Sequence, residues 1–257
     1  MLRRNKIKRK YLNLINTSNN NFTSDNIEKI EKKIIKALIS FSLIILMLLW
    51  GIIPNIILLL LNIDINTLND TTIYIITLIN DILFLTILIS IYYKSIKKNL
   101  FQYFKYNLKE NLKTSISYWL IGLGIMVVSN LFIAIIMNGQ LADNEETVRN
   151  MIDIAPLYML FQLAIYAPIS EELIFRRSIR DIFDNKWLYA LVSGLIFGGL
   201  HVISSITNLT SLLYLIPYCS LGIVFALLYY KTNNIFSSIT VHALHNTLAL
   251  ILYLIGA

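Results

Sequence analysis

Long apolar segments are the feature that most constrains how this chain can fold. Of its 257 residues, 56% are hydrophobic and only 14% are charged, and the mean hydropathy is +0.65. A helix needs about 20 consecutive apolar residues to cross a bilayer. The sequence therefore predicts an all-α, polytopic membrane helical bundle of about seven transmembrane helices, and it excludes an ordinary soluble domain. We expect the spans at 37–61, 73–93, 115–137, 157–183, 187–204, 211–230 and 235–255.

The basic residues predict how this bundle is oriented. With a cytoplasmic N-terminus, 21 of the 22 lysines and arginines fall on the cytoplasmic side, and only Arg149 lies outside. The expected outer loops carry the acidic residues Asp64, Asp70, Asp143, Glu145 and Glu146. This is the positive-inside pattern. The net charge of +7 flanks apolar segments, so it favours contact with anionic membrane lipids and not with nucleic acid.

The chain divides into a short tail and a membrane domain. Residues 1–36 predict a basic cytoplasmic N-terminal tail with an amphipathic helix and no cleavable signal peptide, and residues 37–257 predict the membrane domain. Within this domain, 94–114 predicts a helix lying on the inner leaflet. The polar pair Asn80-Asp81 predicts a partner on a neighbouring helix, and Cys219 predicts an inert packing residue.

The adjacent carboxylates Glu171 and Glu172 predict a functional site. A charged side chain at the centre of a bilayer costs about 3 kcal/mol or more, and function is the usual compensation. Glu172 and Arg176 are i and i+4 on a helix, so they can form a structural ion pair. Glu171 lies about 100° away around the helix and is left free for general acid or base chemistry.

All three histidines follow in apolar segments. His201 lies one helical turn after Phe197, and the intervening Gly198 and Gly199 make the helix slim enough for another backbone or a substrate to approach. Alternatively, His201 could have a purely structural role, in which it hydrogen-bonds a neighbouring carbonyl group.

His242 and Asn246 are i and i+4, so both project to one side of a helix and could bind a metal or stabilise an oxyanion. His245 lies on the adjacent face of the helix, and either a structural role or a supporting role in the site is compatible with this position. With a helical rise of about 1.5 Å per residue, Glu171, His201 and His242 reach similar depths in the bilayer. We therefore expect Glu171, His201, His242 and Asn246 to line one cavity.

These three motifs resemble those of the CPBP family, the CAAX-protease and bacteriocin-processing (Abi) proteins. The family pattern is Glu-Glu-x-x-x-Arg, then Phe-x-x-x-His, then His-x-x-x-Asn, and here the motifs begin at Glu171, Phe197 and His242 in that order. The resemblance covers roughly 110–255, which we expect to be the catalytic core. It implies an intramembrane endopeptidase in which Glu171 and His201 activate a water molecule, while His242 and Asn246 form an oxyanion hole.

The resemblance gives Glu172, Arg176 and Phe197 supporting roles and leaves metal dependence open. A divalent metal such as zinc could be held by Glu171, His201 and His242, which would make the protein a metalloprotease. We favour glutamate-activated water, because Asn246 is a poor zinc ligand but a good amide donor.

The expected substrate is a small hydrophobic, lipidated or leader-bearing peptide, and the expected location is the cell membrane of a bacterium. Two other functions remain open. The chain could be a non-catalytic immunity or scaffold protein that binds a bacteriocin or another partner, or, less favoured, a transporter. No internal repeat supports the transporter.

Overall fold

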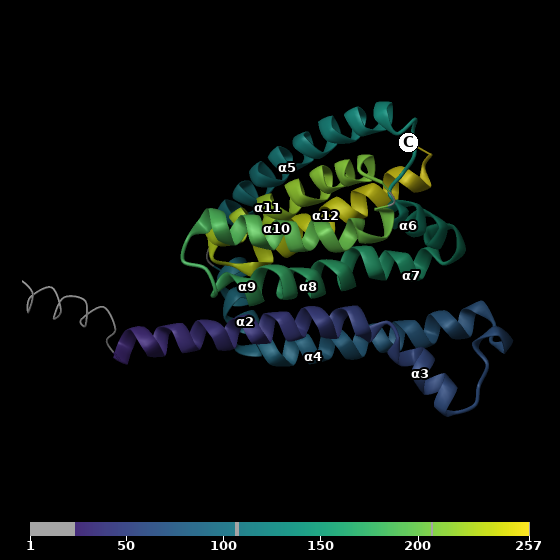
Figure 1. Cartoon of the computed structure of the whole chain (residues 1–257), viewed down its shortest axis with the longest axis horizontal. Coiled ribbons are helices and arrows are strands. Elements are labelled where there is room, and N and C mark those ends of the chain that lie inside the picture. The colour runs from purple at the N-terminus through teal and green to yellow at the C-terminus, as the bar shows by residue number, and fades with distance from the viewer. Residues whose placement is uncertain (1–23, 106–107, 207, 257) are drawn as a thin grey trace, which may run out of the picture.

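The part of the chain that the structure describes is all α-helical. The computed structural model describes residues 24–105, 108–206 and 208–256, and these contain no strand (Figure 1). The all-α prediction is therefore confirmed, while residues 1–23 of the predicted tail lie outside the described residues. The helices are α2 Ser24–Trp50, α3 Ile53–Leu60, α4 Asp70–Lys105, α5 Leu108–Ile136, α6 Asp143–Ile154, α7 Pro156–Phe161, α8 Ala167–Glu171, α9 Ser178–Arg180, α10 Lys186–Val202, α11 Leu215–Thr232 and α12 Ile235–Leu254.

Six helices in the described part are long and apolar enough to cross a membrane: α2, α4, α5, α10, α11 with the turn before it, and α12. The span expected at 157–183 is not one continuous α-helix. It is a helical run from Pro156 to Arg180 in which two π-helical turns, Gln162–Tyr166 and Glu172–Arg177, separate α7, α8 and α9. Such π turns are rare and occur often at functional sites.

Two expected helix boundaries were wrong. The expected separate helix at 94–114 is absent, because α4 continues to Lys105 without a glycine or proline to stop it. The amphipathic lead-in and the first span likewise form one helix, α2, which ends at Trp50 and not near residue 61. Pro54 lies in the first turn of α3, where its missing N–H costs no hydrogen bond.

The helices form a layered bundle. In Figure 1, α2, α3 and α4 lie along one side, α7 to α12 form the middle, and α5 crosses the opposite side. The closest approach joins α10 to α11, because a Cβ atom at Gly198 would lie 2.4 Å from Sγ of Cys219, and one at Gly194 would lie 2.4 Å from a side-chain atom of Ile223. Small residues permit such close packing in membranes. The buried Cys219 thus has the packing role that was predicted.

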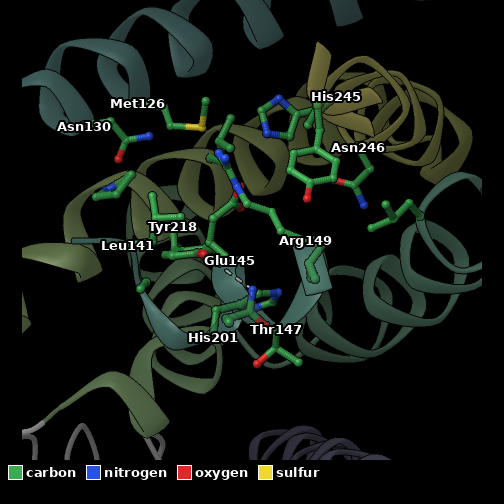
Figure 2. Close-up of a pocket in the computed structure, with 18 of the residues that line it drawn as sticks. Met126, Asn130, Leu141, Glu145, Thr147, Arg149, His201, Tyr218, His245 and Asn246 are labelled. Atoms are coloured by element: carbon green, nitrogen blue, oxygen red, sulfur yellow. Dashed lines mark hydrogen bonds and ion pairs between the residues drawn. The ribbon is translucent and has the colours of Figure 1, made fainter. Parts of the chain in front are cut away.

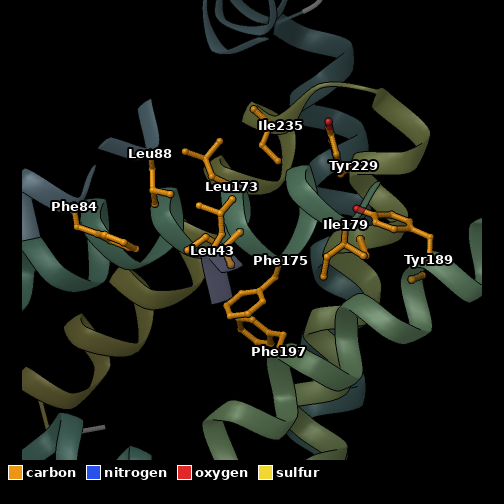
Figure 3. Packing of buried hydrophobic residues seen from close by; sticks show 13 residues of the cluster. Leu43, Phe84, Leu88, Leu173, Phe175, Ile179, Tyr189, Phe197, Tyr229 and Ile235 are labelled. Atoms are coloured by element: carbon orange, nitrogen blue, oxygen red, sulfur yellow. The ribbon is translucent and has the colours of Figure 1, made fainter. Parts of the chain in front are cut away.

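The largest buried cluster surrounds the helical run that carries Glu171. Phe84, Leu173 and Phe175 have almost no exposed surface, and the Phe175 ring packs edge-to-face on Phe197 at 5.7 Å (Figure 3). This cluster joins α4, the Pro156–Arg180 run and α10. Close packing of this kind, rather than exclusion of water, associates helices in lipid.

The polar pair in α4 has the partner that was predicted. Oδ2 of Asp81 accepts hydrogen bonds from the Tyr158 hydroxyl at 3.0 Å and from Nε2 of Gln162 at 2.5 Å. The carbonyl oxygen of Asn80 accepts a bond from the Trp50 indole N–H at 2.9 Å. These bonds fasten α4 to the start of the Pro156–Arg180 run and to α2.

Candidate active site

Three helical segments bring the motif residues to one place. Glu171 is the last residue of α8 and Glu172 the first residue of the following π turn. His201 lies in the last turn of α10, and His242 lies in the first half of α12. The helical periodicity predicted these elements, but only the packing of the helices brings the side chains together.

The Glu171 carboxylate lies between the two motif histidines. Its Oε1 is 3.9 Å from Nε2 of His201, and its Oε2 is 3.6 Å from Nε2 of His242. The whole residue is 8% exposed, and among the described residues its Oε2 has no hydrogen-bond partner. Both distances exceed a direct hydrogen bond and are of a size that one water molecule can bridge.

A fixed hydrogen bond defines which nitrogen of His201 faces Glu171. Nδ1 of His201 lies 2.8 Å from the carbonyl oxygen of Phe197. Because a carbonyl oxygen only accepts, Nδ1 carries the hydrogen. In the neutral ring Nε2 is then an unprotonated acceptor directed toward Glu171. The ring also stacks on Tyr218, with 5.2 Å between the centroids.

Glu172 orients His242 from the other side. Its Oε1 is 3.0 Å from Nδ1 of His242, and its Oε2 is 3.3 Å from Nε of Arg176. Glu172 and Arg176 are fully buried, so the predicted i, i+4 ion pair is present, and Glu172 has His242 as a second partner. An ionised carboxylate accepts the Nδ1 hydrogen, which leaves Nε2 of His242 facing Glu171.

Phe197 and Ser193 complete the surroundings of Arg176. The guanidinium carbon of Arg176 lies 4.6 Å from the centre of the Phe197 ring, and its Nη1 donates to Oγ of Ser193 at 3.4 Å. A guanidinium over an aromatic face is attracted by the ring quadrupole. The supporting set Glu172, Arg176 and Phe197 therefore forms one connected group beside the two histidines.

The remaining motif residues lie on α12. Asn246 is one turn after His242, lines the same cavity as Glu171, and forms no hydrogen bond to another described residue. His245 also lines the cavity, but its Nδ1 accepts a hydrogen bond from the Trp119 indole at 3.4 Å. The tryptophan N–H can only donate, so this bond ties His245 to α5 rather than to Glu171.

The candidate site opens into a cavity of about 890 Å³. Its walls come from α5, α6, α7, α11 and α12, and Figure 2 shows His201, His245 and Asn246 around it together with Glu145 and Arg149 of α6. Nε of Arg149 donates to Oε1 of Glu145 at 2.8 Å. That α6 forms a cavity wall was not predicted from the sequence, although its polar residues between two apolar spans were a visible signal.

Tyr158 and Gln162 are two cavity-lining residues that the motif search did not identify. Their polar groups are bonded to Asp81, and Gln162 opens the first π turn. A glutamine in an otherwise apolar segment is the sequence signal that could have revealed this wall.

The candidate metal ligands of the sequence are Glu171, His201 and His242. In the described part of the chain, no three His, Cys, Asp or Glu side chains are arranged so that they could hold an ion. Glu171 does lie between the two histidines, at 3.9 Å from Nε2 of His201 and 3.6 Å from Nε2 of His242.

Comparison with known proteins identifies the family. The model of the type II CAAX prenyl endopeptidase Rce1-like family matches residues 153–248, which include all three motifs. The UPF0177 protein YbdI of Lactococcus lactis subsp. lactis (strain IL1403) is 28% identical over 182 residues, covering 68% of this chain and 94% of YbdI. The UPF0177 protein YxdF of the same strain is 30% identical over 132 residues, covering 49% of this chain and 71% of YxdF.

A further relative carries a functional name. YdiL of Bacillus subtilis (strain 168), named as a candidate membrane peptidase, is 32% identical over 119 residues, which is 45% of each chain. No solved structure matches the chain. With its bundle of apolar helices and these bacterial relatives, the chain is a multi-pass membrane protein and belongs to the CPBP family, which includes the Rce1-like membrane endopeptidases.

Proposed function

We propose that the chain is an intramembrane endopeptidase of a bacterial cell membrane that uses glutamate-activated water without a metal. The observation that carries this proposal is the Glu171 carboxylate, which lies at the cavity between Nε2 of His201 and Nε2 of His242. Peptide hydrolysis needs an activated water molecule and stabilisation of the oxyanion. The arrangement offers groups for both tasks.

The first task falls to Glu171 and His201. Glu171 and the unprotonated Nε2 of His201 both accept hydrogen bonds, so a water molecule between them would donate to both. As the water oxygen bonds to the carbonyl carbon of the peptide, one of its protons passes to Glu171. When the C–N bond breaks, this proton passes to the leaving nitrogen, and the products are a free carboxyl group and a free amine.

The second task falls to His242 and Asn246. The amide of Asn246 can donate to the oxyanion directly. His242 can donate through Nε2 when both ring nitrogens carry a proton, because Nδ1 already donates to Glu172. Glu172 and Arg176 are positioning residues that hold this ring in place. Removal of one oxyanion donor typically costs about 10²–10³ in kcat.

The proposed substrates are small hydrophobic, lipid-modified or leader-bearing peptides. The cavity volume of about 890 Å³ is large enough for several residues of an extended peptide. Much of its lining is apolar, including Met126, Leu131, Leu163 and Leu221. An apolar lining favours hydrophobic side chains or a lipid chain over a polar substrate.

The test compares membrane and secreted peptides by mass spectrometry of their N- and C-termini. Cells would carry the wild type, Glu171→Gln, the control Glu146→Gln, or no copy. Glu146 is exposed on α6 and does not line the cavity, so its variant makes the same charge change outside the site. We expect fragments with the wild type and Glu146→Gln that are absent with Glu171→Gln.

Retained processing by a well-expressed Glu171→Gln protein would refute the mechanism. Identical peptide profiles for all four strains, combined with a difference in toxin survival between the wild type and the strain without a copy, would support a binding or immunity role instead. Asn246→Ala tests the second task, because we expect it to lower kcat more than it raises KM.

A further inference from the structure

Asp81 is a buried carboxylate that takes no part in the proposed hydrolysis. It lies in the membrane-spanning helix α4, is 5% exposed, and forms no ion pair with another described residue. A charged side chain within a membrane span is costly and usually marks a functional group. Its Oδ2 accepts instead from two neutral donors on the Pro156–Arg180 run, the Tyr158 hydroxyl at 3.0 Å and Nε2 of Gln162 at 2.5 Å. Asp81 therefore acts on these two side chains.

The bonds to Asp81 and Tyr158 determine which end of the Gln162 amide faces the cavity. Because the carboxylate oxygen accepts, the amide atom beside Asp81 is the nitrogen. The same Nε2 also donates to the Tyr158 hydroxyl at 2.6 Å. Oε1 of Gln162, by contrast, bonds none of the described residues and keeps accessible surface, and Gln162 lines the cavity. The cavity wall therefore presents a hydrogen-bond acceptor that is held in a fixed orientation.

The first π turn brings Gln162 to the same side of the helical run as Glu171. The two residues are nine positions apart, and in a straight α-helix at about 100° per residue they would point about 180° apart. The π turn Gln162–Tyr166 closes its hydrogen bond over one residue more than an α turn, so it acts as an insertion of one residue. The rotation that remains is about 80°. Both side chains accordingly line one cavity.

The distance along the run corresponds to a short length of peptide. Nine residues at a rise of about 1.5 Å place Gln162 about 13 Å from Glu171 along the axis. An extended peptide covers about 3.3 Å per residue, so about four residues span this distance. The wall beside Gln162 is apolar and includes Met159 and Leu163, where a peptide N–H without an acceptor costs free energy. A peptide held at Glu171 therefore needs an acceptor near Gln162.

We propose that Gln162 is a substrate-binding residue whose Oε1 accepts a backbone N–H of the peptide about four residues from the cleaved bond. Asp81 and Tyr158 are positioning residues that hold this acceptor toward the cavity. The contact is made with the backbone, so it selects for the length of the extended segment and not for its side chains. This inference rests on the proposed function, because it needs a peptide that is cleaved at Glu171.

Peptides with one methylated backbone nitrogen test this contact. The probe is a synthetic copy of the peptide that the wild type cleaves in the mass-spectrometric comparison, made in a series that carries a single N-methyl group at one residue after another. The values of kcat and KM are measured in detergent micelles for the wild type, Gln162→Met, Asp81→Leu and the control Gln102→Met. Gln102 is exposed on α4 and does not line the cavity, so its variant makes the same chemical change outside the site.

One methylated position should be sensitive in the wild type and in Gln102→Met. We expect methylation about four residues from the cleaved bond to raise KM about threefold to tenfold, which is the effect of one lost hydrogen bond. Gln162→Met should raise KM for the unmethylated peptide by a similar factor and should not respond to methylation at that position. In Asp81→Leu the Tyr158 hydroxyl is free to donate to Oε1 of Gln162, so the methylation effect should disappear there too.

A methylation effect that persists unchanged in Gln162→Met overturns the proposal, and so does a wild type in which no methylated position raises KM. A Gln162 side chain with only a structural role would lower kcat for all peptides alike and leave the sensitive position in place. The scan with the wild type decides the matter even where Gln162→Met does not fold. If the wild type cleaves no peptide, the proposed function itself is refuted, whereas cleavage without a sensitive position refutes this inference alone.

Discussion

The contact between α10 and α11 predicts opposite effects for two adjacent glycines. A Cβ atom at Gly198 would lie 2.4 Å from Sγ of Cys219 and 2.8 Å from its backbone nitrogen, whereas a Cβ atom at Gly199 would have nothing within 4 Å. The side-chain clash could be relieved by a rotation, but the backbone clash could not. Gly198→Ala must therefore push the two helices apart, while Gly199→Ala is accommodated without movement.

The magnitudes follow from these distances. Overpacking of a tight core costs about 1–3 kcal/mol, and replacement of a helical glycine by alanine gains up to about 1 kcal/mol. We therefore expect overpacking in Gly198→Ala to lower the free energy of unfolding by about 1–3 kcal/mol, a loss that the alanine propensity offsets only in part. Gly199→Ala should be neutral or stabilising, because it has the propensity gain without the overpacking. Cys219→Ala should restore only part of the loss in Gly198→Ala, because the backbone nitrogen stays in place.

The assay is reversible unfolding of the purified protein in mixed micelles, followed by tryptophan fluorescence. Trp119 of α5 packs against α11 and bonds His245 of α12, so its emission reports the loss of this packing when the bundle unfolds. Equal stabilities for Gly198→Ala and Gly199→Ala would refute the reasoning. The same displacement should slow processing, since His201 lies on the helix that moves.

Three further predictions concern charges and metal. Arg176→Met should destabilise the protein by about 3–5 kcal/mol, because it removes one partner of the buried Glu172 carboxylate; Glu172→Gln in the same chain should recover part of this in a double-mutant cycle. The Lys33 amine, 2.5 Å from the Asp184 carboxylate, lowers the pKa of that group below its usual 3.8. The contact therefore stabilises the folded protein above pH 3.8, and this stabilisation is lost as the pH falls through the lowered pKa. The free energies of unfolding of the wild type and of Asp184→Asn should accordingly become equal at acid pH. Treatment with a zinc chelator should leave processing by purified protein unchanged, and a loss that zinc restores would contradict metal-free catalysis.

Much of the architecture could be predicted from local patterns. Runs of apolar residues define the spanning helices, and the spacing of Glu172 and Arg176 predicted an ion pair that the structure contains. The convergence of Glu171, His201 and His242 followed from helix rise alone, and the three side chains do lie together. These features depend on the periodicity and rise of a helix, which are the same in every chain.

Other features depended on contacts between distant segments. The sequence did not reveal that Glu172 also bonds His242, or that Gly194 joins Gly198 at the contact with α11. The position of α6 over the cavity was likewise not predicted. In each case the partner lies on another helix, and the register and rotation of two helices are not encoded in the period of either one.

The sequence by itself determined the helices, their approximate depth and the three motifs, because hydropathy and helical spacing are local properties. The tertiary structure alone decided which histidine nitrogen faces Glu171, that Trp119 holds His245, and that α6 forms a wall of the cavity. The physical reason is that such contacts of 3 to 4 Å are fixed only by close packing of side chains from separate helices.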